Sequence, residues 1–170
     1  LDMVPAEQLE LMKEEQFVPC ACTPLLDAIG MSLTRLEKEV KKHERALASV
    51  TIITDGYENA STEYNLQQIH QLIGRLKEQE GWNFAYMGAN QNVAEVSVEL
   101  NIDVQNAREF EFSCTGARDA FSAYNEGNMN FFSAVENCDR EVGENVSEAL
   151  HRKIRRQMMA ARSFFKRDDD

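Results

Sequence analysis

Long apolar runs are absent from the 170 residues, and no apolar stretch near the start follows a basic end. A helix that crosses a bilayer needs about 18 apolar residues in a row, and a secretory signal needs a basic end followed by an apolar segment. The sequence therefore predicts neither a membrane span nor a secretory signal.

Proline, glycine and cysteine are also scarce, with 3, 8 and 4 residues. So little proline and glycine excludes collagen-like and low-complexity chains, whereas 43% apolar residues can build a buried core. Four cysteines are too few for a disulfide scaffold, and the gap between Cys20 and Cys22 is too short for a zinc knuckle. We interpret the chain as one domain from a reducing compartment and expect it in the cytoplasm.

Basic residues are outnumbered, with 18 Lys and Arg against 29 Asp and Glu and a formal net charge of −11. An acidic surface repels phosphate backbones, so we expect no nucleic acid partner. Neither Gly-x-x-x-x-Gly-Lys-[Ser/Thr] nor Gly-x-Gly-x-x-Gly occurs. The sequence therefore lacks the usual phosphate cradles of nucleotide-binding proteins.

Helical and strand patterns alternate along the chain. Thr23 followed by Pro24 is typical of a helix start, with the threonine oxygen as the N-cap and the proline at the first helical position. Apolar spacing predicts helices over 24–46, 66–76, 93–100 and 115–137, and strands over 48–54, 82–87 and 109–112. This order favours an α/β, Rossmann-like fold with a mostly parallel sheet flanked by helices.

A different composition marks the last part of the chain. Residues 144–170 hold 7 basic and 5 acidic residues, which leaves 11 and 24 in the preceding 143, or +2 against −13. We predict an α/β domain over 1–143 and an amphipathic basic helix with an acidic end over 144–170. Packing of this helix on a protein surface is favoured over membrane binding.

Polar loops follow the predicted strands, and ligands of parallel sheets bind where such loops lie. Asp55 ends an apolar strand, so its carboxylate must be solvated, capped or bound to a cation. A turn cap with Gly56 is the simpler alternative on local sequence alone.

Three segments carry a resemblance to the von Willebrand factor A domain of the bacterial stand-alone kind, and it extends over about residues 17–140. They are Cys22-Thr-Pro-Leu-Leu-Asp-Ala-Ile-Gly30, Val50-Thr-Ile-Ile-Thr-Asp-Gly56 and Trp82-Asn-Phe-Ala-Tyr-Met-Gly-Ala-Asn90. The resemblance implies that Thr23 and Asp55 are parts of a metal-ion-dependent adhesion site. Such a site holds Mg²⁺ or Mn²⁺ and captures an acidic side chain of a protein partner. The partner-binding loop residues would then be Gly56, Tyr57, Asn59, Gly88 and Asn90.

The family's first motif, Asp-x-Ser-x-Ser, is absent from the chain. In the family's strand order, 3-2-1-4-5-6, the strand that ends at Asp55 is the fourth, so the chain resembles a C-terminal portion that lacks its N-terminal strands. We therefore expect weak metal binding by this chain alone. We also expect strand 48–54 to form an exposed edge that pairs with a second copy or with a missing N-terminal segment.

Together these features predict a non-enzymatic protein-interaction module. The alternatives are a metal-dependent hydrolase that uses Asp55 and Glu58, and a vestigial half-domain that serves assembly only. A nucleophilic role for Cys114 is not favoured, and none of His43, His70 and His151 has a companion at ligand spacing. The helical aromatic residues are predicted to be core, namely Phe121, Tyr124, Phe131 and Phe132.

Overall fold

A computed structural model describes residues 22–43 and 46–142, together with residues 6–8, 10, 13, 15, 150, 154, 164 and 165. Most of the predicted basic helix and acidic end over 144–170 lies outside these residues. A short 3₁₀ turn, Ala6–Gln8, precedes the main elements. These are α1 (Leu25–Val40), β1 (Ser49–Thr54), α2 (Leu66–Arg75), β2 (Asn83–Ala89), α3 (Val93–Glu99), β3 (Ala107–Phe110) and α4 (Cys114–Val142). No helix among the described residues has the length and apolar character that a membrane crossing requires.

The three strands form one parallel sheet in the order β1-β2-β3. Ser49 to Thr54 of β1 pair in register with Asn83 to Gly88 of β2. Each strand is joined to its neighbour by a helical crossover, so chain order and sheet order agree. The predicted α/β, Rossmann-like class is confirmed.

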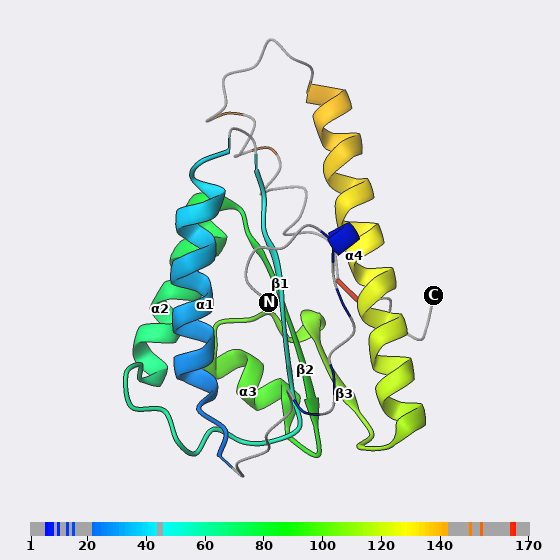
Figure 1. Cartoon of the computed structure of the whole chain (residues 1–170). Helices are drawn as coiled ribbons and strands as arrows, with labels where there is room; N and C mark the ends of the chain where they lie inside the picture. The colour runs from blue at the N-terminus through cyan, green and yellow to red at the C-terminus, as the bar shows by residue number, and fades with distance from the viewer. Residues whose placement is uncertain are drawn as a thin grey trace.

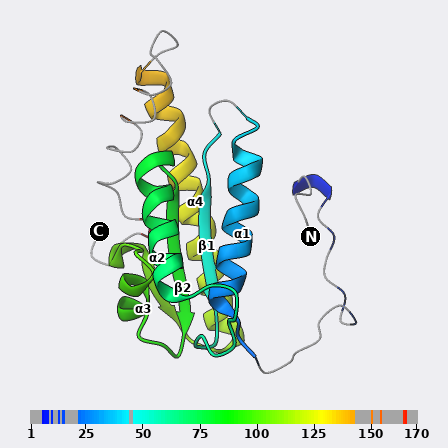
Figure 2. The same ribbon diagram turned by 90° about the vertical axis from the view of Figure 1, so that its left-hand side faces the viewer.

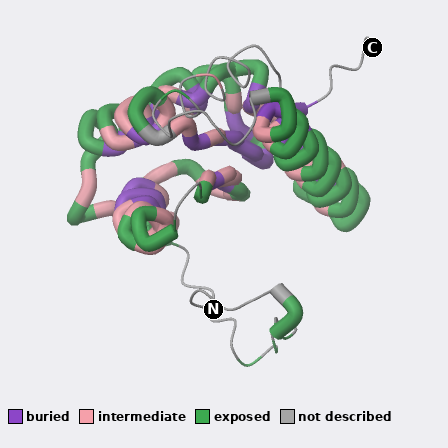
Figure 3. The backbone as a smooth tube through the Cα atoms, turned by 90° about the horizontal axis from the view of Figure 1, so that it is seen from above, coloured by how far each residue is buried: buried purple, intermediate pink, exposed green. Residues whose placement is uncertain are grey.

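Helices cover both faces of the sheet. In Figure 1, α1, α2 and α3 lie on one side of the strands and α4 lies on the other, and Figure 2 shows the same layers from the α1 and α2 side. The central strand β2 supplies both cores: Phe84 and Tyr86 pack under α1 to α3, and Ala85 and Met87 pack under α4. Buried residues therefore line the inner sides of the layers, as Figure 3 shows.

The start of α1 differs from the prediction. Pro24, not Thr23, is the N-cap, and no side chain of the cap residue accepts a hydrogen bond from the helix. The Leu26 N–H instead donates to Glu58 Oε2 at 2.9 Å, from a loop 32 residues away. The predicted cap role of the Thr23 side chain is therefore wrong, because a carboxylate from another segment occupies that position.

A close approach fixes α1 against the start of α2. A Cβ added at Gly30 would lie 2.5 Å from the ring of Tyr64, so only glycine allows this contact. Thr34 Oγ1 donates to the Gly30 carbonyl oxygen at 2.7 Å and lies 3.4 Å from the Tyr64 hydroxyl. Tyr64, which lies between β1 and α2, therefore contacts one turn of α1, from Gly30 to Thr34.

Two element predictions need correction. The third strand spans Ala107–Phe110 and not 109–112, because β2 pairs with it from Ala107 onward. The α4 aromatic residues are not all core: Phe131 is buried, but Phe121 and Phe132 are 55% and 48% exposed. Phe121 precedes Asn128 by seven residues and Phe132 follows it by four. Residues at these spacings lie on the same flank of a helix, so both exposed rings lie on the flank of Asn128.

This flank of α4 faces the open edge of the sheet. The Ser49 hydroxyl of β1 donates to Asn128 Oδ1 at 3.2 Å, which places the flank beside β1. Within the described sheet β1 has one neighbour, β2, and Ile53 of β1 is 41% exposed. Ile53 therefore adds an exposed apolar side chain to this edge strand. We name Ile53, Phe121 and Phe132 the edge patch.

Candidate functional site

The loop that follows β1 packs against the start of α1. A Cβ added at Gly56 would lie 2.9 Å from Thr23 Oγ1, so the two chain segments are in close contact. The Thr23 N–H donates to Asn59 Oδ1 at 2.8 Å, and the Asn59 N–H donates to the Thr23 carbonyl oxygen at 3.2 Å. Thr23 thus meets Gly56 and Asn59 at the carboxyl edge of the sheet. Gly56 and Asn59 belong to one loop, and Thr23 precedes that loop by more than 30 residues.

The turn after β1 is closed by Thr54 and not by Asp55. The Gly56 N–H donates to Thr54 Oγ1 at 3.2 Å, and the same hydroxyl donates to the Gly56 carbonyl oxygen at 2.9 Å. Asp55 is exposed, and its carboxylate has no hydrogen-bond or ion-pair partner within the part of the chain that the structure describes. The turn-cap alternative for Asp55 is therefore wrong, because the neighbouring hydroxyl already fills that role.

Within the described residues, Thr23 and Asp55 have few other candidate metal ligands beside them. The described residues include no cluster of three or more His, Cys, Asp or Glu side chains that could hold a metal ion. Thr23 and Asp55 could supply two oxygen atoms, whereas Mg²⁺ favours six. Any cation here would need water or groups outside the described residues for most of its shell.

Glu58 is committed to local structure. Its carboxylate accepts hydrogen bonds from the N–H groups of Leu26, Ala60 and Ser61 and from the Ser61 hydroxyl, at distances of 2.7 to 2.9 Å. Burial opposes ionisation, but these hydrogen bonds outweigh it and lower the pKa of Glu58 to about 2. A carboxylate with such a low pKa is a weak general base at neutral pH, so the geometry does not favour Glu58 in the hydrolase alternative.

A second carboxylate, that of Asp27, holds the same loop, a role that the sequence analysis did not predict. The Asp27 carboxylate accepts hydrogen bonds from the N–H groups of Thr62, Glu63 and Tyr64 at 2.8 to 2.9 Å. The bond from Thr62 is the largest of the effects that lower the pKa of Asp27. From the sequence alone, an aspartate in the first turn of a helix is expected only to interact favourably with the helix dipole. The N–H groups that bind Asp27 lie 35 to 37 residues away, so the sequence pattern does not reveal them.

The loop after β2 differs in part from the prediction. Gly88 is the sixth residue of β2 and is buried, so it lies outside the loop and away from a partner's reach. Asn90 is exposed and adopts a left-handed conformation with φ 54°, which asparagine tolerates. Tyr57, 56% exposed, reaches over from the first loop and accepts a hydrogen bond from the Asn92 N–H at 3.4 Å.

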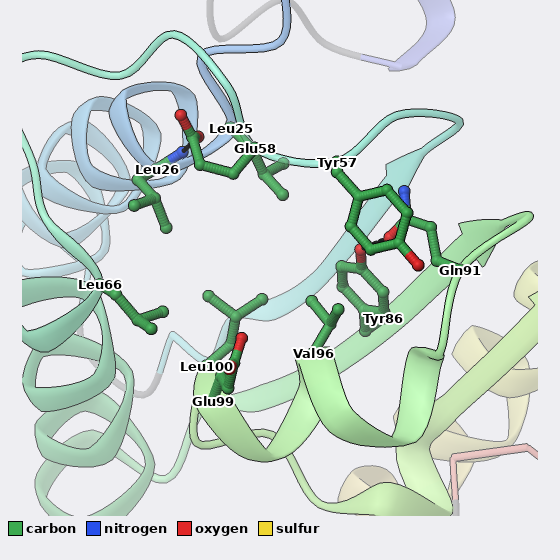
Figure 4. Close-up of a pocket in the computed structure, with 10 residues that line it drawn as sticks. All are labelled: Leu25, Leu26, Tyr57, Glu58, Leu66, Tyr86, Gln91, Val96, Glu99 and Leu100. Atoms are coloured by element: carbon green, nitrogen blue, oxygen red, sulfur yellow. Dashed lines mark hydrogen bonds between the residues drawn. The ribbon is translucent and has the colours of Figure 1, made fainter.

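A pocket of about 290 Å³ opens beside these loops, between the start of α1, the start of α2 and α3. Figure 4 shows Leu66 of α2 and Val96 of α3 pointing into the same space, with the ring of Tyr57 at one side. We name this space the Tyr57 pocket. Its lining residues are Leu25, Leu26, Tyr57, Glu58, Leu66, Tyr86, Gln91, Val96, Glu99 and Leu100.

Comparisons of the chain with protein-family models, with curated proteins and with solved structures give no match.

Proposed function

We propose that this chain is a protein-interaction module of the von Willebrand factor A type. In this proposal Thr23 and Asp55 hold a divalent cation, Mg²⁺ or Mn²⁺, together with ligands from outside the described residues. The cation then binds an acidic side chain of a protein partner, and the neighbouring loop residues contact that partner. We propose no catalytic role for the chain.

The state of the Asp55 carboxylate carries this proposal. It is exposed at the end of β1 without a partner among the described residues, while Thr54 closes the turn and Glu58 and Asp27 secure the rest of the loop. Thr23 is held against Gly56, next to this carboxylate in sequence. A hydroxyl and a carboxylate on a fixed loop are the ligand types that a hard divalent cation prefers.

The cation binding is testable through stability. We expect Mg²⁺ or Mn²⁺ at millimolar concentration to raise the melting temperature, because an ion that binds only the folded chain stabilises it. At an ion concentration ten times the Kd, the gain is about 1.4 kcal/mol. Asp55→Ala should abolish the shift, as followed by a thermal melt monitored by circular dichroism.

Asp119→Ala serves as the control, since Asp119 is an exposed aspartate on α4, away from the loop after β1. Its melting temperature should respond to the ions as the unaltered chain does. An equal ion response in the Asp55→Ala variant would contradict the proposed site. So would the absence of any response in the unaltered chain at about 10 mM, roughly ten times the Kd of about 1 mM that the weakest divalent-cation sites have.

The open edge of β1 favours a second candidate function, assembly. β1 has backbone groups free for pairing on one side within the described sheet, and the edge patch adds exposed apolar side chains next to it. Exposed edges with apolar neighbours tend to pair with another strand. We propose that β1 pairs with β1 of a second copy, or with a separate N-terminal segment.

We expect the purified chain to form a dimer at high concentration, measured by light scattering after size-exclusion chromatography. Ile53→Lys should weaken the dimer by about tenfold or more, because it places two charges at the paired edge. Val98→Lys is the control, since Val98 is 58% exposed on α3, on the other face of the sheet. A monomer at every concentration, or an equal effect of both substitutions, would contradict self-pairing through β1.

A further inference from the structure

The aromatic dipeptide Phe164-Phe165 completes the core beneath α4. Both of its side chains are buried, and they share that core with the β2 side chains Ala85 and Met87. Figure 1 shows this short red segment beside α4. Residues 143–163 separate the dipeptide from the end of α4 in the sequence. One layer of the domain is therefore closed by two side chains from a remote part of the chain.

A notch in α4 receives the first of these rings. A Cβ added at Gly127 would overlap the ring of Phe164, so only glycine leaves room for the ring at this position. Gly127 lies near the middle of α4, where glycine is unfavourable relative to alanine. The ring that the glycine admits explains why an unfavourable helix residue stands there.

Asn106 binds the main chain of the same dipeptide. Its Oδ1 accepts a hydrogen bond from the Phe164 N–H at 2.8 Å, and its Nδ2 donates to the Phe84 carbonyl oxygen at 3.2 Å. The second bond fixes the buried amide to β2, so that Oδ1 faces the dipeptide. Withdrawal of the dipeptide would take the hydrogen bond from a buried acceptor, which is unfavourable unless another N–H replaces it.

These contacts make a site that recognises both the rings and the backbone of an aromatic dipeptide. We name it the dipeptide site, and its residues are Ala85, Met87, Asn106 and Gly127. All four belong to the part of the chain that ends with α4, so the site and its occupant come from separate segments.

Charge and reach favour a second copy of the chain as another source of the dipeptide. Residues 144–170, which carry the dipeptide, have a formal charge of +2, whereas the preceding 143 residues have −13. Opposite charges attract this segment to a neighbouring copy. The 21 residues from 143 to 163 would span about 30 Å even as a helix, which is the diameter of a small domain. Phe164 can therefore reach the same site on a neighbour.

We propose that the dipeptide site also binds the Phe164-Phe165 dipeptide of a second copy of this chain, in exchange for its own. The exchanged dipeptide makes the contacts described above, and each copy gives one dipeptide and receives one, so the pair closes with twofold symmetry. The exchange uses the core under α4 and neither Asp55 nor the open edge of β1. It therefore goes beyond both proposed functions and is tested independently of them.

The probe is a fluorescein-labelled peptide of residues 160–170, and its binding to the full chain is followed by fluorescence anisotropy. The Phe164→Ala/Phe165→Ala variant, whose site is vacant, should bind it saturably with a Kd on the order of 100 µM, because the two rings and the hydrogen bond are regained. The unaltered chain should bind the peptide about tenfold more weakly, since its own dipeptide competes at an effective concentration of about a millimolar.

Matched controls separate these contacts from charge and from folding. A peptide with Phe164→Ala and Phe165→Ala keeps every charge and should not bind saturably. Gly127→Ala, added to the vacant variant, should weaken peptide binding by about tenfold or more, because its methyl group takes the place of the ring. The same change should raise the melting temperature of the vacant variant by about 3 °C, since alanine favours the helix once the ring is gone. Ser122→Ala, at an exposed position of α4, should leave peptide binding unchanged.

Three results would overturn the inference. They are equal binding of the two peptides, equal binding by the vacant and unaltered chains, and no saturable binding by the vacant variant at about 1 mM peptide, ten times the expected Kd. Phe164→Ala alone repeats the test where the double variant does not melt cooperatively. If neither variant melts cooperatively, the dipeptide is a fixed part of the fold and cannot be exchanged, which also overturns the inference.

Discussion

Glu58→Ala should lower the free energy of unfolding by about 3 kcal/mol, since hydrogen bonds to a charged group contribute about 1.5 to 3 kcal/mol each and this half-exposed site retains part of that. The substitution leaves three backbone N–H groups without their acceptor, at Leu26, Ala60 and Ser61. It also releases the loop that carries Asp55, so we expect the ion-dependent stabilisation to be lost in the same variant. Urea unfolding measures the first effect, and the thermal ion titration measures the second.

Glu63→Ala is the control for this experiment. Glu63 lies in the same loop and is exposed. Its backbone N–H donates a hydrogen bond to Asp27, a contact that the substitution of its side chain leaves in place. Its stability should change by less than about 0.5 kcal/mol, as is usual for surface substitutions. Equal effects of the two substitutions would contradict the role of the Glu58 carboxylate in holding the loop to α1.

Acid should unfold the chain through a second carboxylate, Glu37 of α1. Both oxygens of Glu37 accept hydrogen bonds of 2.7 Å from the Arg75 guanidinium of α2. This pair, together with Lys41 and against the opposing effect of burial, lowers the pKa of Glu37 from its usual 4.5 to about 2. A lowered folded-state pKa means that the stabilisation is fully present above about pH 5 and is lost as the pH falls through 2.

The Glu37 side chain is 14% exposed and that of Arg75 is 37% exposed, so solvent screens part of the interaction. Allowing for this, we expect Glu37→Gln to lower stability at pH 7 by about 2 kcal/mol and to flatten the decline between about pH 5 and 2. Urea unfolding at a series of pH values measures both effects. Glu39→Gln alters a partly exposed glutamate on the same helix, whose pKa is lowered mainly by its hydrogen bond with Lys42, and should change the pH profile much less than Glu37→Gln. A profile equally steep in Glu37→Gln and the unaltered chain would contradict this assignment.

Regular patterns predicted most of the fold. The patterns that predict α1, α2 and β1 each depend on residues close in sequence. They are the apolar spacing of the two helices and the apolar run that ends before Asp55. Such local patterns fix the type of each element, and alternation of the types fixes a parallel sheet. The open edge at β1 also agrees with the prediction, because the described sheet has no strand beyond it.

Contacts between distant segments were not predictable in the same way. Glu58 caps a helix 32 residues before it, and Asp27 binds a loop 35 to 37 residues after it, yet both read as ordinary surface acids in sequence. Likewise the spacing of Phe121 and Phe132 predicts that they share a flank, but whether another layer covers that flank depends on the rest of the sheet. Thr23 and Asp55 were chosen through a resemblance, and the contact of Thr23 with Gly56, the residue after Asp55, depends on the fold as a whole.

The contact between Gly30 and Tyr64 has a consequence for how this sequence can evolve. Any side chain at position 30 would overlap the ring at position 64, so a change at 30 is tolerated only after the ring has become smaller. The two positions should therefore vary together among descendants of this sequence. Wherever position 64 keeps an aromatic ring, position 30 should keep glycine. An evolutionary path that changes position 30 first passes through a poorly folded intermediate, whereas a path that changes position 64 first passes through a cavity that a later side chain at 30 can fill.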